Sequence, residues 1–378
     1  MTAGMQRSAD ALSRLAMSHD ASRFLLTPEE VVVASGIADV QALFAEATHH
    51  RRHLTLRGGG TSLSGQSITD GILVDVRRRF RDIEVLDDGA RVRAGAGATV
   101  AQVNARLKPY GRRIGADPAS ARAATMGGVV ANNSSGKLCG QADDPFHTID
   151  ALVAVLPNGR VVDTADPDAD ISLTWEDPTL AGGLAILRRR LRDDPESMAE
   201  IARLWSMRNA MGYHLQALTD FAKPSSILRQ LLVGSEGTLA FIAEVTMRTV
   251  PLRPAHRVDL ALFDTLDAAL DAAAGLVEHG FDAIELFDDD AIRLIQGLRG
   301  VAPALRGIEV DGHAALSLEL HADTPSCSPN ASSGPATCST NSPTSARSPD
   351  SCATSPCGTC TTARTPPRRS DARPARRS

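Results

Sequence analysis

Three consecutive glycines stand in the segment Arg57-Gly58-Gly59-Gly60-Thr61-Ser62-Leu63-Ser64-Gly65-Gln66, directly after a predicted strand over residues 53–57. Glycine lets the backbone bend so that several N–H groups point at one anion, and the hydroxyls of Thr61 and Ser62 add donors. No helical pattern follows, unlike in a Rossmann fold, and no Gly-Lys-Ser/Thr sequence ends the loop, unlike in a P-loop. The segment predicts a pyrophosphate-binding loop, although such a loop, taken alone, is more often a turn.

Two further segments are rich in small and polar residues. The first reads Gly-Ala-Asp-Pro-Ala-Ser at residues 115–120 and Thr-Met-Gly-Gly-Val-Val-Ala-Asn-Asn-Ser-Ser-Gly at residues 125–136. It would let backbone and amide groups approach a flat polar ligand closely, and the alternative is a surface loop. The second, Gly-Ser-Glu-Gly-Thr at residues 234–238, is expected between strands over 227–233 and 240–250, and the alternative is a β-turn.

Local patterns in the rest of the chain alternate between strands and helices. Asp87-Asp88-Gly89 separates two short apolar runs, which predicts a β-hairpin. Thr99 is predicted to cap a helix over 99–107. After Pro251 the pattern predicts a βαβαβ series, with strands at 258–263, 282–287 and 314–322 and helices at 266–279 and 288–298. We expect its sheet to be unfinished, with an unpaired edge near the last of these strands.

The composition narrows the class of protein. The chain has 378 residues, 43% of them hydrophobic and 22% charged, as in ordinary globular enzymes. Aromatic residues make up 3% and the net charge is −5, which argues against a nucleic-acid partner. No apolar run approaches the roughly 20 residues that span a bilayer, and Arg7, Asp10 and Arg14 interrupt any apolar signal-peptide core. These features predict a cytoplasmic protein without a membrane span.

The last part of the chain differs from the rest. After Asp323 there is no Val, Ile, Leu, Phe, Met, Trp or Tyr, so residues 323–378 are expected to be disordered. Nearly all of them have codons with G or C in the middle, as a GC-rich gene read out of frame would produce; the alternative is a natural Ser/Thr/Pro-rich linker. We interpret Cys357-Gly-Thr-Cys360 as an accident of the shifted frame and predict no metal site. Residues 1–322 contain a single cysteine, Cys139.

In this order and spacing, the three segments resemble the FAD-binding domain of the p-cresol methylhydroxylase/vanillyl-alcohol oxidase superfamily. Within it, the chain is similar to the branch of D-lactate, glycolate and D-2-hydroxyglutarate dehydrogenases, over about residues 26–322. The glycine loop matches the family's pyrophosphate loop, the second segment its flavin-lining segment, and the third a later turn. Residues 208–213 resemble the family's Lys-Asn-x-x-Gly-Tyr segment near the flavin, with Arg208 in place of Lys.

The resemblance implies an α+β fold with several parts. These are an N-terminal helical segment (1–25), a two-lobed FAD-binding domain (26–255), a truncated α+β substrate (cap) domain (256–322) and the disordered tail (323–378).

The resemblance also implies a non-covalently bound FAD. Some members attach FAD through a histidine in the glycine-rich loop, whereas this loop carries Thr61 and Ser62, and His53 lies upstream on the strand. The residues expected to bind FAD come from the three segments and from the strand that follows: Gly58, Gly59, Gly60, Thr61, Ser62, Gln66, Ser67, Asp117, Pro118, Ser120, Thr125, Gly127, Gly128, Asn132, Asn133, Ser134, Gly234, Glu236, Gly237 and Ile242.

The activity implied is that of an FAD-dependent dehydrogenase of small 2-hydroxy acids, in which hydride leaves the substrate α-carbon for flavin N5 while a base takes the hydroxyl proton. In this branch the carboxylate-binding Arg and the His residues that hold a metal or act as a base come from the second domain. We name no catalytic residue, because His313 and His321 are expected to be ordinary surface or core residues. The specific acid and the electron acceptor stay open.

Two alternatives to this activity remain. One is the alkyl transfer of the alkylglycerone-phosphate synthase type, which uses the same FAD fold. The other is a non-catalytic FAD-binding fragment, because the reading is expected to stop inside the substrate domain. On that expectation the 378-residue chain itself is predicted to be inactive.

Overall fold

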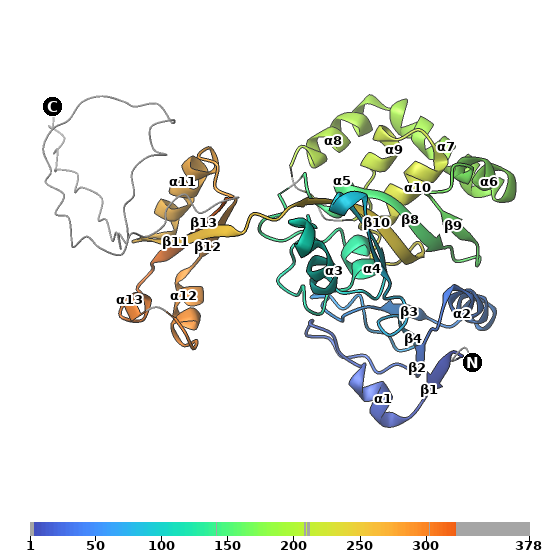
Figure 1. The fold of residues 1–378 in the computed structure, drawn as a ribbon, viewed down its shortest axis with the longest axis horizontal. Helices are drawn as coiled ribbons and strands as arrows, with labels where there is room; N and C mark the ends of the chain where they lie inside the picture. Colours follow the sequence, from blue (N-terminus) through green and yellow to red (C-terminus); the bar gives the residue numbers. More distant parts are fainter. Residues whose placement is uncertain (1–3, 141, 208, 210–211, 302, 323–378) are drawn as a thin grey trace, which may run out of the picture. The chain divides into compact units, whose positions relative to one another are not determined.

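The computed structural model describes residues 4–322 apart from 141, 208, 210–211 and 302 (Figure 1). Contacts within the chain separate a first unit, which ends at Leu252, from a second unit, which begins at Arg253. Both units mix helices and strands, which confirms the predicted α+β class. The predicted tail at 323–378 lies outside the described residues. Each helix in the described part is too short or too polar to cross a bilayer.

The first lobe of the first unit is a small, mainly parallel sheet with one covering helix. Its elements are β1 (Gln6–Ser8), α1 (Ala11–Ala16), β2 (Glu30–Val33), α2 (Ile37–His50), β3 (Leu54–Arg57) and β4 (Ile72–Asp75). The strand order is β1-β2-β4-β3, and only β1 runs antiparallel to its neighbour. Helix α2 buries Val40 and Leu43 in one cluster with Val32 and Val74 of the sheet. The segment expected to be helical, 1–25, contains α1 but also the strand β1.

The second lobe is built on an antiparallel sheet. Its strands are, in spatial order, β5 (Ile83–Leu86), β6 (Arg91–Gly95), β10 (Phe241–Pro251), β8 (Ile149–Val155) and β9 (Val161–Asp163), and β7 (Arg112–Ile114) also pairs with β10. The predicted hairpin is confirmed, since β5 pairs with β6 and the turn holds Asp88 at φ 50° and Gly89 at φ 90°.

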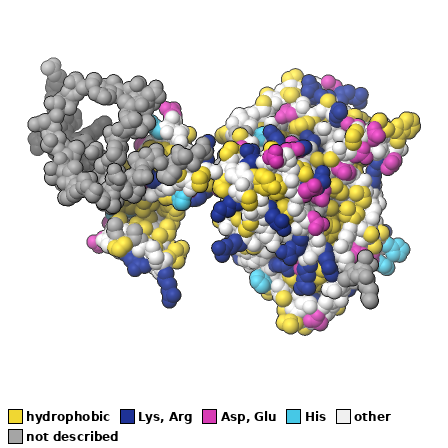
Figure 2. Space-filling model, viewed as in Figure 1, with side chains coloured by type: hydrophobic (Ala, Val, Ile, Leu, Met, Phe, Trp, Pro, Cys, Tyr) yellow, Lys and Arg dark blue, Asp and Glu magenta, His cyan; other side chains and the backbone are white. Residues whose placement is uncertain are grey.

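Helices surround this sheet. They are α3 (Val100–Leu107), α4 (Met126–Ala131), α5 (Pro145–Thr148), α6 (Ala169–Glu176), α7 (Pro178–Arg192), α8 (Pro195–Trp205), α9 (Gln216–Asp220) and α10 (Pro224–Leu232). The predicted cap of α3 is confirmed, because the side chain of Thr99 accepts a hydrogen bond from the backbone N–H of Gln102. Basic, acidic and apolar side chains are interspersed on the face of the unit shown in Figure 2, as expected of a chain with 40 basic and 45 acidic residues.

One predicted strand is wrong. Residues 227–233 belong almost entirely to helix α10, so the turn at 234–238 joins a helix to β10 rather than two strands. Pro224 occupies the first turn of the helix, and Ile227 and Leu232 are buried in the core. An apolar run this short has no period that separates a strand from a buried helix, so packing decides between them.

The second unit has the predicted βαβαβ order. Its elements are β11 (Ala255–Phe263), α11 (Leu266–Val277), β12 (Ala283–Phe287), α12 (Asp289–Gln296), α13 (Pro303–Arg306) and β13 (Ala314–Ala322). Ala269 of α11 packs against Ala314 and Leu316 of the sheet. The predicted unpaired edge at β13 is wrong, because the strand order is β11-β13-β12. The last strand inserts between the two earlier strands and is hydrogen-bonded to both, which leaves β11 and β12 at the edges.

Candidate functional site

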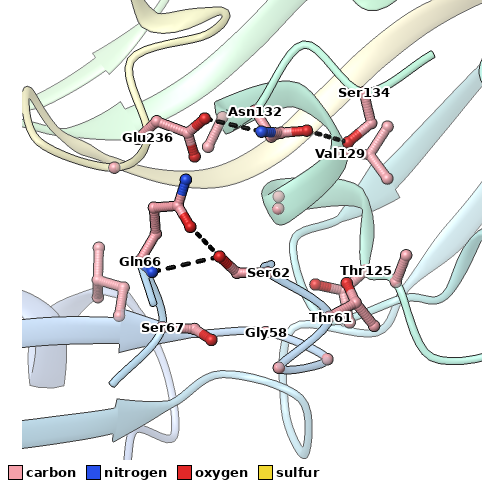
Figure 3. Close-up of a pocket in the computed structure, with 18 of the residues that line it drawn as sticks. Gly58, Thr61, Ser62, Gln66, Ser67, Thr125, Val129, Asn132, Ser134 and Glu236 are labelled. Carbon is pink, nitrogen blue, oxygen red and sulfur yellow. Dashed lines mark hydrogen bonds between the residues drawn. The ribbon is translucent and has the colours of Figure 1, made fainter. Parts of the chain in front are cut away.

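A cavity of about 420 Å³ lies within the first unit, where the three segments singled out in the sequence meet (Figure 3). Most residues predicted to bind FAD line it: Gly58, Gly59, Gly60, Thr61, Ser62, Gln66, Ser67, Pro118, Ser120, Thr125, Gly127, Gly128, Asn132, Ser134, Glu236, Gly237 and Ile242. Its volume falls in the range of small-molecule and cofactor sites. The structure therefore places residues from both lobes around one space.

The glycine loop lies directly against the segment that precedes α4. A Cβ added to Gly58 would lie 2.3 Å from Oγ1 of Thr125, and one added to Gly59 would lie 2.0 Å from the carbonyl oxygen of Ala123. Gly60 adopts φ +67°, a backbone conformation that is unfavourable for residues with a side chain. The absence of side chains therefore has a structural reason at all three positions, and the loop backbone is left facing the cavity.

A buried hydroxyl group on the cavity wall has no partner. Thr125 is only 2% exposed, and its Oγ1 makes no hydrogen bond to any residue that the structure describes. Buried hydroxyls are usually hydrogen-bonded, because leaving one unpaired costs free energy. Thr125 is thus suited to donate to a ligand in the cavity.

Opposite the loop, a carboxylate and an amide form a pair (Figure 3). Asn132 Nδ2 donates to Glu236 Oε1 at 2.7 Å, and Asn132 Oδ1 accepts from Ser134 Oγ at 2.7 Å. The backbone of Glu236 has φ +54° and its N–H donates to the carbonyl of Ala131 at 2.7 Å, so the turn is fastened to the end of α4. Burial raises the pKa of the Glu236 carboxyl above its ordinary value, and the bond from Asn132 opposes this.

The polar loop after the glycines closes on itself. Gln66 N donates to Ser62 Oγ at 3.2 Å, and the Ser62 hydroxyl donates to the side-chain carbonyl of Gln66. Ser67 Oγ donates to Asp20 Oδ2 at 2.9 Å. These bonds hold the hydroxyl-bearing stretch at the cavity rim.

Asp117 lies behind the cavity wall instead of lining it. Its carboxylate accepts from the backbone N–H of Leu138 at 3.1 Å, and its own N–H donates to the carbonyl of Ser135 at 2.9 Å. Burial raises the pKa of Asp117. The residue ties the 115–120 stretch to the end of the 125–136 stretch, so it supports the cavity from outside.

Asn133 and Gly234 also lie outside the lining and fasten neighbouring turns. Asn133 is buried at φ +48°, its Oδ1 accepts from Phe146 N at 3.0 Å, and its Nδ2 lies 3.3 Å from Nε2 of His214. Gly234 has φ +77°, and a Cβ there would lie 2.9 Å from Cδ2 of His214. Burial lowers the pKa of His214, which favours its neutral form. The sequence analysis did not single out His214. The residue directly follows Tyr213, the last residue of the 208–213 motif, and this position was the sequence feature that could have indicated it.

The structure adds an apolar wall that the sequence motifs did not indicate. Leu56, Val76, Ala96 and Phe241 line the cavity from strand ends or the residues next to them. Ala96 lies between Gly95 and Gly97, and a Cβ at Gly127 would lie 2.8 Å from its Cβ. Strand ends that adjoin a glycine-rich motif are the sequence signal for such residues.

The other motif residues are not all placed at the cavity. Arg208 lies outside the described residues, whereas the hydroxyl of Tyr213 lies 2.8 Å from Oγ1 of Thr238. In the second unit, His321 Nε2 lies 2.8 Å from a carboxylate oxygen of Glu319. Within the described part of the chain, no three His, Cys, Asp or Glu residues are grouped as metal ligands would be.

Comparison with known proteins gives a family match in each of the two units. Residues 28–165 match the FAD binding domain family, and residues 252–333 match the C-terminal domain of FAD linked oxidases. The D-2-hydroxyglutarate dehydrogenase of Pantoea ananatis is 33% identical over 74% of this chain, which corresponds to 28% of that protein. The glycolate oxidase subunit GlcD of Escherichia coli is 26% identical over 79% of this chain and 49% of that protein.

A solved structure shares the fold. An alkyldihydroxyacetonephosphate synthase superposes with a TM-score of 0.57 and 18% identity, covering 84% of this chain and 53% of that one. The chain therefore spans about a quarter to a half of the length of these relatives.

Proposed function

Because this chain belongs to the FAD-linked oxidases, in the branch of the D-2-hydroxy-acid dehydrogenases, and has FAD as its cofactor, we propose that it takes part in oxidising a small D-2-hydroxy acid. When bound, FAD supplies the acceptor for the hydride that leaves the substrate α-carbon. The cavity carries the proposal, since its side-chain-free loop and unpaired Thr125 hydroxyl suit a phosphate-bearing ligand.

We propose that different groups of residues in this chain bind different parts of the cofactor. The backbone of Gly58–Gly60, with the hydroxyls of Thr61 and Thr125, would bind the diphosphate, because these are neutral donors that face the cavity. The Asn132–Glu236 pair would meet a hydrogen-bonding edge of the ligand on the other side. The apolar wall would exclude water from it.

We propose that FAD is held without a covalent link. Thr61 and Ser62 occupy the loop at the cavity, and neither has a nucleophilic imidazole. The side chain of His53 is 80% exposed and lies 3.3 Å from Asp70, rather than in the cavity lining.

The groups that bind the substrate carboxylate and take its hydroxyl proton are expected from the second domain. In the described part of that domain, His321 is engaged with Glu319 and stacks against His256 at 5.8 Å. We assign no catalytic base there.

Anaerobic stopped-flow measurement of the flavin absorbance band tests the proposal. The purified chain is loaded with FAD and mixed separately with D-2-hydroxyglutarate, glycolate and D-lactate. Bleaching by one acid would identify the substrate and place the catalytic groups within this chain. FAD binding without bleaching by any acid would favour the FAD-binding-fragment alternative, and failure to bind FAD would contradict the proposed function itself.

A further inference from the structure

A buried arginine lies under the glycine loop, outside the cavity lining. Arg57 ends strand β3 and is only 7% exposed. A Cβ added to Gly60 would lie 2.5 Å from Nη2 of Arg57 and 3.0 Å from Cζ, so the guanidinium packs directly against the loop that faces the cavity.

The partners of this guanidinium are backbone carbonyls rather than carboxylates. Nη2 donates to His19 O at 2.8 Å, and Nη1 donates to Met17 O at 3.2 Å and Ser67 O at 3.3 Å. The Nε–H group is buried and has no hydrogen-bond partner among the described residues. Desolvation lowers the pKa of Arg57 and the positive charge of Arg77 lowers it further, whereas the charges of Asp20 and Asp75 act in the opposite direction.

The two nearby acids are engaged elsewhere. Asp75 is paired with Arg77 at 2.8 Å, and Asp20 accepts hydrogen bonds from Ser22 N and from the Ser67 hydroxyl, both at 2.9 Å. A buried positive charge without a close counter-ion is costly, so its persistence calls for a compensating anion. Among the described residues, the side chains that line the cavity include no Lys, Arg or His.

We propose that Arg57 supplies the positive charge that holds the FAD diphosphate, acting through the glycine loop from beneath rather than by contact. This rests on the proposed FAD binding in the cavity. Arg57 is thereby a positioning residue that adds a net charge to a cradle of otherwise neutral donors. The inference predicts that its effect is confined to ligands that carry phosphate.

Two ligands distinguish an electrostatic effect of Arg57 on the diphosphate from a structural effect on the whole site. ADP carries the diphosphate and adenosine half of FAD, whereas riboflavin carries the flavin ring without phosphate. We would measure dissociation constants for ADP by calorimetry at low and moderate salt, and for riboflavin by fluorescence quenching. Arg57→Met should weaken ADP binding by roughly tenfold or more and flatten its salt dependence, while riboflavin binding changes by less than about twofold. Arg57→Lys should fall between the wild type and Arg57→Met, because it keeps the charge.

Arg229→Met is the matched control. Arg229 is a partly buried arginine that donates to a backbone carbonyl, Asp150 O at 2.6 Å, and has a buried, unpaired Nε, but it lies outside the cavity lining. It should lose stability without losing ADP affinity. Equal ADP affinities of Arg57→Met and Arg229→Met, or equal losses for ADP and riboflavin, would overturn the inference.

Asp20→Asn keeps the proposal testable if Arg57→Met does not fold. Asp20 opposes the charge of Arg57, so its neutralisation should tighten ADP binding severalfold. An ADP affinity that is unchanged, or that falls while riboflavin binding is kept, would refute the role of Arg57. A wild-type chain that binds neither FAD nor ADP would instead remove the proposed site, which is a distinguishable result.

Discussion

Replacing Gly59 by alanine should weaken FAD binding, because the added methyl group has no room. A Cβ here would lie 2.0 Å from the carbonyl oxygen of Ala123, 2.6 Å from its carbonyl carbon and 3.2 Å from the amide nitrogen of Ala124. All three are backbone atoms, so no side chain can move aside. To reach ordinary contact at 3.4 Å, one of the two segments must retreat by about 1.4 Å.

The segment around Ala123 resists this movement. The N–H groups of Ala123 and Ala124 both donate to Ser120 O at 2.8 Å, and Val100 N donates to Ala124 O at 3.0 Å. The glycine loop should therefore be displaced, and overpacking of this kind costs about 1–3 kcal/mol. If that cost falls on the bound state, FAD affinity drops roughly 5- to 150-fold.

Gly182→Ala provides the control, since a Cβ at this position in α7 meets nothing within 4 Å. It should leave FAD affinity unchanged and slightly stabilise the helix. The assay is quenching of FAD fluorescence by the wild type and both variants, with thermal unfolding of each followed by circular dichroism. A Gly59→Ala protein that binds FAD within about twofold of the wild type would refute the reasoning that this backbone forms the site.

Further predictions concern the cavity and the gene. Burial raises the pKa of Glu236 in the folded protein. A carboxyl group with a raised pKa destabilises the fold once the pH rises above the pKa that the group has in the unfolded chain. Glu236→Gln should therefore raise the Tm of the FAD-free protein at pH 7 but not near pH 4. A Tm difference that is independent of pH would contradict this. Thr125→Val removes an unpaired buried hydroxyl, so the FAD-free protein should keep or gain stability while FAD affinity falls roughly fivefold; unchanged affinity would show that Oγ1 does not meet the ligand. Acid precipitation should release all FAD into the supernatant, whereas flavin retained on the chain would reveal a covalent link. Translation of the gene beyond codon 323 in the other frames should yield a sequence with periodic Leu, Val and Ile, and its absence would favour the natural-linker alternative.

Short-range interactions explain the parts of the fold that were predicted correctly. The hairpin turn depends on the positive φ of Asp88 and Gly89, and the start of α3 depends on a bond between Thr99 and Gln102. Each is decided within a few residues, so the local sequence contains the information. The strand predicted at residues 227–233 was wrong for the opposite reason. Their apolar side chains suit either a strand or a helix, and only their burial against distant parts of the core makes them helical.

By itself, the sequence determined that three glycine-rich and polar segments exist, and that their residue types suit a phosphate-bearing ligand. The tertiary structure decided which residues line the cavity: Asp117, Asn133 and Gly234 lie outside its lining, while Leu56 and Phe241 belong to it. It also placed β13 between two earlier strands and turned Arg57 under the loop. The physical reason is that both the direction in which a side chain points and the pairing of strands depend on contacts between segments far apart in the chain, which no local pattern encodes.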